Sequence, residues 1–397
     1  DGRRARPQGS HLNGPAGGCP DRMNIDRPVR VALDAVALLD TRTGVGRFVE
    51  ETIFRLARRT DLRLSAFGYW PRARTKLRAV LPPGVAVSPF PMLGPPLRFL
   101  WRHGRLPPVE CWSGRVDVVH GPNFLAPPAW RAAELITVHD LTILRYPEYC
   151  TSDTLQFPAL IRRAIGRGAW IHTVSRFVAA EVVELLGADP AKVVTIPNGV
   201  SPVPDADPAS GRQLAGCHRY VLALGTVEPR KNLPGLVAAF DAVAARLPEV
   251  RLVIAGPDGW GTAALDAAIG QAAHRSRIVR LGWVSETQRA ALLRGAAVLA
   301  YPSVYEGFGL PPLEAMAVGT PVVTTRTGGI PEVVGDAARC VEPDDNQALA
   351  HALEEVLTDE ELAAQLRERG KARAELFSWQ NTAEQLARLY HRIADAA

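Results

Sequence analysis

The chain has 397 residues, of which 47% are hydrophobic and 22% are charged. This length exceeds one ordinary hydrophobic core and fits a globular protein of two domains. No apolar run approaches the roughly 18 residues of a membrane span, and no apolar signal-peptide core is present near the start. The five cysteines are scattered, which argues for free thiols in a reducing compartment and against a disulfide framework or a zinc site.

Charge is distributed unevenly along the chain. Residues 1–200 carry 27 Lys and Arg against 17 Asp and Glu, whereas the remainder carries 19 against 24. A basic first half suggests an anionic partner, although compositional drift in an arginine-rich sequence would give the same numbers. No recognised nucleic-acid-binding motif accompanies the charge, so we do not expect nucleic acid as a partner.

Short β-rich runs alternate with longer helical patterns, which is typical of βαβ units and parallel sheets. The runs are apolar and mostly β-branched, as expected of strands that are covered on both faces. The predicted strands are Val29–Asp34, Leu62–Phe67, Val116–His120, Leu135–His139, Ile171–Val174, Val193–Ile196, Tyr220–Leu224, Arg251–Ala255, Ile278–Leu281, Val298–Tyr301 and Val322–Thr325. The predicted helices include Phe48–Arg59, Leu313–Val318, Glu360–Glu375 and Thr382–Ala394.

A proline-rich polar stretch, Ser201–Pro208, separates the two sets of strands. We therefore predict an α/β protein with two Rossmann-like, doubly wound domains that face each other across a cleft. The expected division is a disordered extension (1–23), an N-terminal domain (24–200), a linker (201–218), a C-terminal domain (219–380) and a helix that crosses back to the N-terminal domain (381–397). Ligands of open α/β sheets lie beyond the carboxyl ends of strands, so residues that follow strands are the first functional candidates.

The most informative segment is a glycine turn between two carboxylates, Glu306 and Glu314, which lie eight positions apart. The turn leads into a predicted helix, whose early N–H groups (Phe308, Gly309 and Leu310 onward) are free to bind an anion. Glycine lets the backbone approach that anion closely. A nucleotide sugar suits this arrangement, because its diphosphate can bind the amides while its hydroxyls bind the carboxylates.

A second candidate segment follows the first strand of the second set and runs from Gly225 to Asn232. Arg230 can bind a diphosphate as a fork and Lys231 as a point charge. Sugar transfer builds negative charge on the leaving diphosphate, and fixed cations can stabilise that charge without a metal. No spacing of His, Cys, Asp and Glu indicates a metal site, so we expect neither a metal nor another cofactor.

Two further candidates lie in the first half. Gly44 and Gly46 form a turn that could face a phosphate, but Val49 occupies the third glycine position of a dinucleotide fingerprint, which disfavours NAD. His139 and Asp140 end a predicted strand. His139 could bond a sugar hydroxyl while a carboxylate holds its imidazole, or it could be an ordinary strand-end histidine.

Taken in order, these segments resemble the family 4 retaining glycosyltransferases, which have the GT-B fold. The resemblance covers residues 29–390, and Glu306 and Glu314 match the family's E-x7-E motif. The other motifs that carry it are Thr43–Arg47, Thr137–Asp140, Ile196–Val200, Glu228–Leu233 and Pro302–Pro311. The residues of two of these motifs, Thr43–Arg47 and Glu228–Leu233, are most similar to those of mannosyltransferases and related enzymes of polysaccharide and lipopolysaccharide assembly.

The resemblance implies a role for each candidate residue. Glu306 would contact donor-sugar hydroxyls beside His139, and Glu314 would contact the ribose. Arg230 and Lys231 would hold the diphosphate, helped by the backbone at Gly46 and at residues 308–310. Asn198 would shape the hinge side of the cleft. Family members usually need no metal and often proceed by front-face transfer without a settled nucleophile, so Glu306 is not assigned as one.

The predicted reaction is therefore transfer of a hexose, with retention, from GDP-mannose or a UDP-sugar to a hydroxyl of a glycan or lipid-linked acceptor. The expected setting is cell-envelope polysaccharide assembly in the cytoplasm. The alternatives are a GT-B epimerase or hydrolase that acts on sugar nucleotides, and a non-catalytic module that binds them. Rapid loss of donor in the absence of acceptor would favour the epimerase or hydrolase, and an activity assay excludes the non-catalytic module.

One segment of the first half, Leu97–Leu106, mixes arginine with large apolar side chains, as interfacial segments do. We consider the hypothesis that this segment and the arginines of helix Phe48–Arg59 dock on an anionic membrane surface at its inner face. An ordinary amphipathic helix with solvated arginines explains the same pattern.

Overall fold

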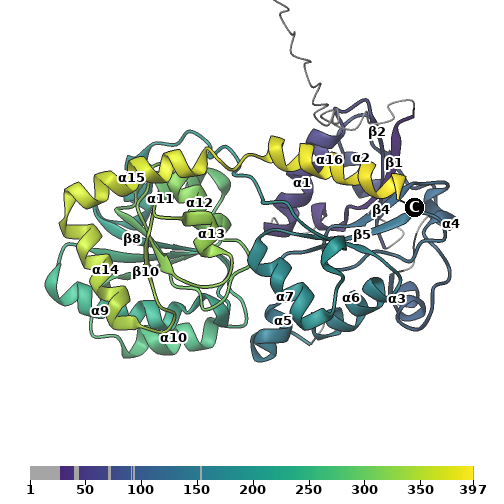
Figure 1. Ribbon diagram of the computed structural model, residues 1–397. Helices are drawn as coiled ribbons and strands as arrows, with labels where there is room; N and C mark the ends of the chain where they lie inside the picture. Colours follow the sequence, from purple (N-terminus) through teal and green to yellow (C-terminus); the bar gives the residue numbers. More distant parts are fainter. Residues whose placement is uncertain are drawn as a thin grey trace, which may run out of the picture.

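The computed structural model describes residues 27–39, 44–69, 73–90, 92, 94–152 and 154–396. The extension expected over residues 1–23 lies outside these described residues. Figure 1 shows two lobes, each with a sheet between helices, so the predicted α/β class is confirmed.

The sheet of the first lobe has seven parallel strands in the order β3-β2-β1-β4-β5-β6-β7. Its strands are β1 (Val29–Asp34), β2 (Leu62–Phe67), β3 (Ala86–Val87), β4 (Val118–Gly121), β5 (Ala133–Val138), β6 (Trp170–Thr173) and β7 (Val193–Thr195). The chain winds outward in one direction from β1 and then in the other from β4. This reversal is the doubly wound topology that the alternating pattern predicted.

The sheet of the second lobe has six parallel strands in the order β10-β9-β8-β11-β12-β13. Its strands are β8 (Tyr220–Leu224), β9 (Arg251–Ala255), β10 (Ile278–Gly282), β11 (Val298–Tyr301), β12 (Val322–Thr325) and β13 (Arg339–Val341). The order reverses between β8 and β11, so their carboxyl ends flank the position where ligands of such sheets bind.

The predicted strands match these elements closely, and β3 and β13 were missed. Both are edge strands of two or three residues that are partly exposed, so neither forms the apolar run by which a buried strand is recognised.

The helices of the first lobe are α1 (Gly44–Leu56), α2 (Ala73–Val80), α3 (Gly94–His103), α4 (Glu110–Ser113), α5 (Thr142–Arg145), α6 (Phe157–Gly166) and α7 (Arg176–Leu186). Those that follow are α8 (Pro208–Ala215), α9 (Leu233–Arg246), α10 (Thr262–Gln271), α11 (Glu286–Gly295), α12 (Leu310–Ala317), α13 (Ile330–Val334), α14 (Asn346–Thr358), α15 (Glu360–Ala374) and α16 (Trp379–Asp395). Short 3-10 turns are η1 (Val36–Leu38), η2 (Pro147–Tyr149), η3 (Thr154–Gln156), η4 (Pro190–Lys192), η5 (Pro229–Lys231) and η6 (Arg275–Arg277).

Two helix predictions need correction. The stretch 201–218, expected as linker, contains α8, whose N-cap Asp207 accepts a hydrogen bond from the Ala209 N–H. Proline at the first position and a capping aspartate start a helix well, so the signal was present but was read as linker composition. Helix α12 begins three residues before the predicted Leu313, because Gly309 (φ 101°) serves as its N-cap and the prolines fall in the first turn.

The last helix, α16, leaves the second lobe after α15 and lies along the first lobe beside α1 (Figure 1). Its buried Leu386, Tyr390 and Ile393 pack into one apolar cluster with Phe48 and Ile53 of α1. Each such buried side chain contributes about 1.5–3 kcal/mol of hydrophobic free energy. The chain therefore crosses between the lobes twice.

The two crossing segments run side by side. Val200 forms a parallel β-bridge with Ser378, and the Val200 N–H donates to the Phe377 carbonyl at 3.1 Å. The two crossings between the lobes are therefore joined to each other at residues 200 and 377–378.

Candidate active site

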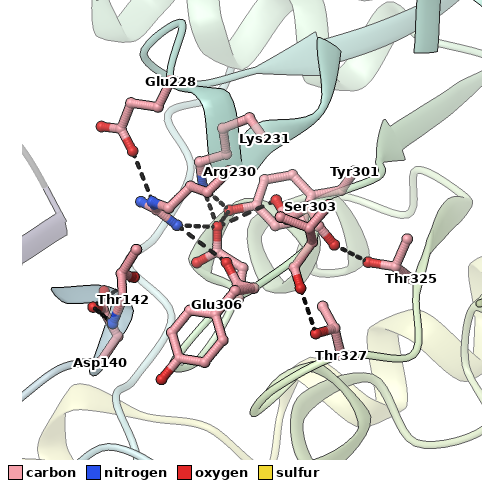
Figure 2. Close-up of polar contacts among 12 residues, drawn as sticks. Asp140, Thr142, Glu228, Arg230, Lys231, Tyr301, Ser303, Glu306, Thr325 and Thr327 are labelled. Carbon is pink, nitrogen blue, oxygen red and sulfur yellow. Dashed lines mark hydrogen bonds and ion pairs between the residues drawn. The ribbon is translucent and has the colours of Figure 1, made fainter. Parts of the chain in front are cut away.

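The candidate residues with the densest polar contacts lie at the carboxyl ends of β8 and β11, the neighbouring strands at which the strand order reverses. Arg230 and Lys231 belong to η5, which follows β8, and Glu306 lies in the loop between β11 and α12. Figure 2 shows the two cations pointing at the Glu306 carboxylate. The backbone joins the two loops as well, because the Val304 N–H donates to the Arg230 carbonyl at 2.8 Å.

Within the described part of the chain, four side chains donate hydrogen bonds to the Glu306 carboxylate, and all four reach the same oxygen, Oε1. Arg230 Nη1 lies 2.5 Å from it, the Tyr301 hydroxyl 2.8 Å and the Ser303 hydroxyl 3.3 Å, and the Lys231 ammonium also donates to it. Arg230 is shared with Glu228, whose Oε2 lies 2.7 Å from Arg230 Nε. The Glu306 side chain is buried, so these donors replace the water that an ionised carboxylate requires.

The electrostatics follow from burial and from the two cations. Burial alone would raise the pKa of Glu306, but the charges of Arg230 and Lys231 outweigh it and lower that pKa to about 2. Glu306 is therefore a carboxylate at neutral pH. Burial and the neighbouring Arg230 charge lower the pKa of Lys231, against the opposing effect of Glu306. Burial and the Glu306 charge raise the pKa of the Tyr301 hydroxyl, which keeps its proton and donates it.

Two threonines at the end of β12 fix the loop that carries Glu306 (Figure 2). The Thr325 hydroxyl donates to the Ser303 carbonyl, and the Thr327 hydroxyl donates to the Val304 carbonyl at 2.8 Å. The carboxylate is thus held by its own contacts and by the backbone that precedes it.

The first lobe approaches this loop at the end of β5. A Cβ atom placed on Gly307 would lie 1.8 Å from the His139 carbonyl oxygen, so only glycine permits this contact. The Ser175 hydroxyl, at the N-cap of α7, donates to the Gly307 carbonyl at 2.7 Å. His139 and the Glu306 loop, which are far apart in sequence, are therefore neighbours.

The expected partner of His139 is wrong. Its Nε2 bonds the Pro122 carbonyl at 2.8 Å, while the Asp140 carboxylate accepts from the Thr142 N–H (3.0 Å) and hydroxyl (2.8 Å). Asp140 lies two residues before α5 and closes its first turn, which is a common use of aspartate. Burial lowers the pKa of His139, so the ring is neutral. Since the carbonyl can only accept, Nε2 carries the proton and Nδ1 is an acceptor.

The remaining candidates are placed as follows. Gly44, at the start of α1, lies in contact distance of the Leu310 side chain, so the first glycine turn faces the start of α12. Gly225 (φ 134°) directly follows β8 beneath Lys231. The neighbour of Asn198, Gly199, packs on the backbone of Trp379, so Asn198 lies beside the two segments that cross between the lobes. Thr43, part of the glycine motif, lies outside the described residues.

Glu314 lies in α12 and is 2% exposed. It forms an ion pair with Arg289 of α11, and its Oε1 lies 3.8 Å from Arg47 Nη1 of α1. Gly46 precedes that arginine in the first turn of α1. The glycine turn of the first lobe and the second carboxylate of the motif are therefore joined through Arg47.

Sequence reasoning missed several side chains that complete this arrangement, namely Tyr301, Ser303, Arg289, Tyr305 and Glu181. Tyr301 and Ser303 precede Glu306 at the carboxyl end of β11, and this position after a strand was a weak sequence signal for them. The Tyr305 hydroxyl donates to Glu181 of the first lobe and accepts from the Leu141 N–H at 3.0 Å. Such a contact across 124 residues has no local signature.

Two family models match the chain in succession: "Glycosyltransferase Family 4" over residues 42–203 and "Glycosyl transferases group 1" over residues 213–373. Among curated proteins, the O-antigen chain mannosyltransferase B of Escherichia coli is 33% identical over 284 residues, which are 69% of this chain and 74% of the relative.

Two solved structures show the same fold. Sucrose-phosphate synthase from Thermosynechococcus elongatus has a TM-score of 0.72 at 20% identity, over 94% of this chain and 100% of the other. HepE from Anabaena, solved in complex with UDP-glucose, has a TM-score of 0.70 at 18% identity, over 91% of this chain and 98% of the other.

Proposed function

This chain belongs to glycosyltransferase family 4 and is a glycosyltransferase, and from that premise we propose its reaction. The proposed reaction moves a hexose from a nucleoside-diphosphate sugar to a hydroxyl of a glycan or lipid-linked acceptor, with retention of anomeric configuration. The proposed setting is cell-envelope polysaccharide assembly, which the 33% identity to an O-antigen mannosyltransferase supports. The observation that carries the proposal is the convergence of Arg230, Lys231 and Glu306 at the switch point of the second sheet.

The two cations suit the diphosphate of the donor. In the arrangement described above, Glu306 supplies the negative charge that Arg230 and Lys231 face. A diphosphate would bring further negative charge to the same cations, and they would stabilise the charge that grows on it as the sugar leaves. The proposed donors are GDP-mannose or a UDP-sugar, and we propose that no metal is required.

The contacts of Glu306 favour a front-face route over a covalent one. Its Oε1 accepts from four donors, which lowers the basicity that a nucleophilic carboxylate needs. In the front-face route the bond from the anomeric carbon to the phosphate oxygen breaks while the bond to the acceptor oxygen forms on the same face. The acceptor proton passes to the departing phosphate, so no protein base is consumed.

His139 has the right form to position the donor sugar. Its ring is neutral, and its Nε2–H is committed to the Pro122 carbonyl. Its Nδ1 can therefore accept a hydrogen bond from a sugar hydroxyl but cannot donate one. We propose that His139 orients the sugar over Glu306.

A donor screen tests the proposal. The melting temperature is measured with GDP-mannose, UDP-glucose and their free nucleoside diphosphates. Binding to the folded state stabilises it by about 2.7 kcal/mol at a hundredfold excess over Kd. We expect nucleotides of one base to raise the melting temperature. When the sugar nucleotide of that base is then incubated with the protein without acceptor, its concentration should not fall. No shift with either base would contradict the proposal, and rapid loss of donor without acceptor would favour an epimerase or hydrolase.

We also propose an anionic membrane surface as a partner of the first lobe. Phe99, Leu100, Leu106 and Trp130 are all exposed, Trp130 at 81%. Phe99 and Leu100 lie on α3 and Leu106 follows it, in a lobe with excess basic charge. The side chains of Arg98, Arg102 and His103 in the predicted segment lie outside the described residues. Among the described residues, no helix combines the length and apolarity needed to cross a bilayer.

Liposome flotation tests this partner. The chain should float with vesicles that contain phosphatidylglycerol and stay in the dense fraction with pure phosphatidylcholine vesicles. Equal binding to both vesicles, or to neither, would remove the membrane from the proposal. The proposed location, in the cytoplasm at the inner face of the membrane, depends on this result.

A further inference from the structure

Four charged side chains form a closed square at the boundary of the two lobes, apart from the Glu306 cluster. Arg47 comes from the first turn of α1 in the first lobe. Glu286 and Arg289 come from α11, and Glu314 comes from α12, all in the second lobe. Positive and negative charges alternate around the square, so each charge has two opposite neighbours.

Each side of the square uses different atoms. Arg47 Nη2 lies 2.9 Å from Glu286 Oε1, and Arg47 Nη1 lies 3.8 Å from Glu314 Oε1. Arg289 Nη1 lies 3.7 Å from Glu286 Oε2, and Arg289 Nη2 pairs with Glu314 Oε2. Each guanidinium therefore contacts both carboxylates through two separate nitrogens, a planar fork that the single ammonium nitrogen of lysine lacks.

The square is neutral only when the lobes are together. Its three members on the second lobe carry two negative charges and one positive charge, and Arg47 supplies the missing positive charge. The Glu314 side chain is only 3% exposed, so water compensates little of its charge, whereas the Glu286 side chain is 37% exposed. A buried carboxylate that loses one of its cations is costly.

We propose that Arg47 is a positioning residue that couples domain closure to recognition of the nucleoside. This inference rests on the proposed function, in which Glu314 accepts hydrogen bonds from the ribose hydroxyls. Arg47 orients the Glu314 carboxylate from the opposite lobe, with Arg289 on its other side. The ribose site is then complete only in the closed arrangement that also brings Gly44 and His139 to the donor.

The experiment compares nucleoside diphosphates that differ only in ribose hydroxyls. Calorimetry measures Kd for GDP and UDP, and for their 2′-deoxy and 3′-deoxy forms, with wild type and with Arg47→Met. Wild type should favour the ribose form by about tenfold, as expected for a hydrogen bond to a charged group. Arg47→Met should weaken the better ribose ligand by about tenfold and reduce that preference toward one.

Three further variants sharpen the result. Arg47→Lys keeps the charge but offers one nitrogen in place of the two that contact Glu286 and Glu314, so its preference should be intermediate. In a Glu314→Gln background, Arg47→Met should have little additional effect, because the two act as one unit. Arg55→Met is the matched control, since Arg55 lies on the same helix and pairs with Glu51 of that helix. It should bind all the nucleotides as wild type does.

The outcomes separate this inference from the function on which it rests. A purely structural role for Arg47 would lower the melting temperature and leave the ribose preference unchanged, and that result would overturn the coupling. Additive effects of Arg47→Met and Glu314→Gln would overturn it as well. If wild type binds neither GDP nor UDP, the proposed function fails and this inference fails with it.

Discussion

At the scale of single residues, the site is defined by how one buried carboxylate is compensated. Glu306 has a pKa of about 2 because Arg230 and Lys231 overcome the cost of its burial. The carboxylate is therefore charged throughout the physiological range. It can accept hydroxyl hydrogens and hold cations, but it cannot act as a general acid.

Replacing Glu306 by glutamine tests this role. Transfer should fall by at least about 100-fold, as expected when one preorganised polar group of an active site is lost. The Kd of the free nucleoside diphosphate should stay the same or tighten, because the carboxylate no longer competes for the two cations. Calorimetry and initial rates measure the two quantities. Glu342→Gln, on an exposed surface, is the control. Undiminished turnover in the Glu306 variant would show that this carboxylate does not serve transfer.

Lys231→Ala tests the diphosphate contact. We expect the Kd of the nucleoside diphosphate to rise by about tenfold, because a charge-assisted contact contributes about 1.5–3 kcal/mol. The Kd of the bare nucleoside should not change. Lys371→Ala, which removes an exposed lysine paired with Glu368, is the matched control. An equal loss for nucleoside and diphosphate would contradict a phosphate role for Lys231.

The sequence could single out Glu306, Glu314, Arg230 and Lys231 as candidates because they belong to recognisable motifs that follow β8 and β11. It could not predict how they are held. Tyr301 and Ser303 act only because the loop folds back, and Arg47 meets Glu286 across 239 residues. Such contacts depend on how the two lobes sit together, which no local pattern records. The error at Asp140 is a local one: a carboxylate beside a histidine was taken as its partner, whereas Asp140 accepts hydrogen bonds from Thr142, two residues further on.

At the scale of elements, the first sheet is crossed by a buried chain of hydrogen bonds. The Tyr390 hydroxyl of α16 bonds His120 Nδ1 (2.7 Å), and His120 Nε2 bonds the Thr137 hydroxyl (2.8 Å). That hydroxyl bonds His172 Nδ1 (2.9 Å), and His172 Nε2 bonds the Ile196 carbonyl (2.9 Å). The carbonyl can only accept, so every proton in the chain is fixed in the direction from Tyr390 to Ile196.

This series of buried hydrogen bonds predicts that the folded protein loses stability in acid. Burial lowers the pKa of His172 from 6.5 to about 4, and burial also lowers the pKa of His120. A histidine that is neutral when folded binds a proton more readily when unfolded, so stability falls as pH drops below 6.5 and continues to fall toward 4. For His172 alone the loss is on the order of 3 kcal/mol.

The measurement is the free energy of unfolding in urea between pH 7 and pH 4.5. His172→Gln keeps an N–H donor but cannot titrate. The free energy of unfolding of the variant should therefore fall less steeply with decreasing pH than that of wild type, and the two slopes should differ by about 1.4 kcal/mol per pH unit. Exposed His351→Gln is the control and should follow wild type. Parallel curves for wild type and His172→Gln would show that the buried chain does not set the acid limit.

The strands were predictable because buried parallel strands form continuous apolar runs. The edge strands were not, because they are only two or three residues long. Helix α8 carried a start signal in Asp207 and Pro208, but that signal lies within linker-like composition. The start of α12 was misplaced because the left-handed conformation of Gly309 cannot be read from its neighbours.

At the scale of the whole molecule, α16 fastens the end of the chain to the first lobe. Leu386 is fully buried in the cluster that α16 shares with α1 and the first sheet. Leu386→Ala should therefore destabilise the protein by about 2–5 kcal/mol. Leu376→Ala should cost less than about 0.5 kcal/mol, because Leu376 is 64% exposed. Equal urea midpoints for the two variants would contradict a structural role for the crossing helix.

The central claim is that Arg230, Lys231, Glu306 and Glu314 bind one nucleotide sugar between the two lobes. A crystal structure with the donor that the screen identifies tests it most directly. In that structure the diphosphate should lie within hydrogen-bond distance of Arg230 and Lys231. The ribose should contact Glu314, and the hexose should lie over Glu306 beside His139. A nucleotide bound elsewhere, with these four side chains out of contact with it, would contradict the account.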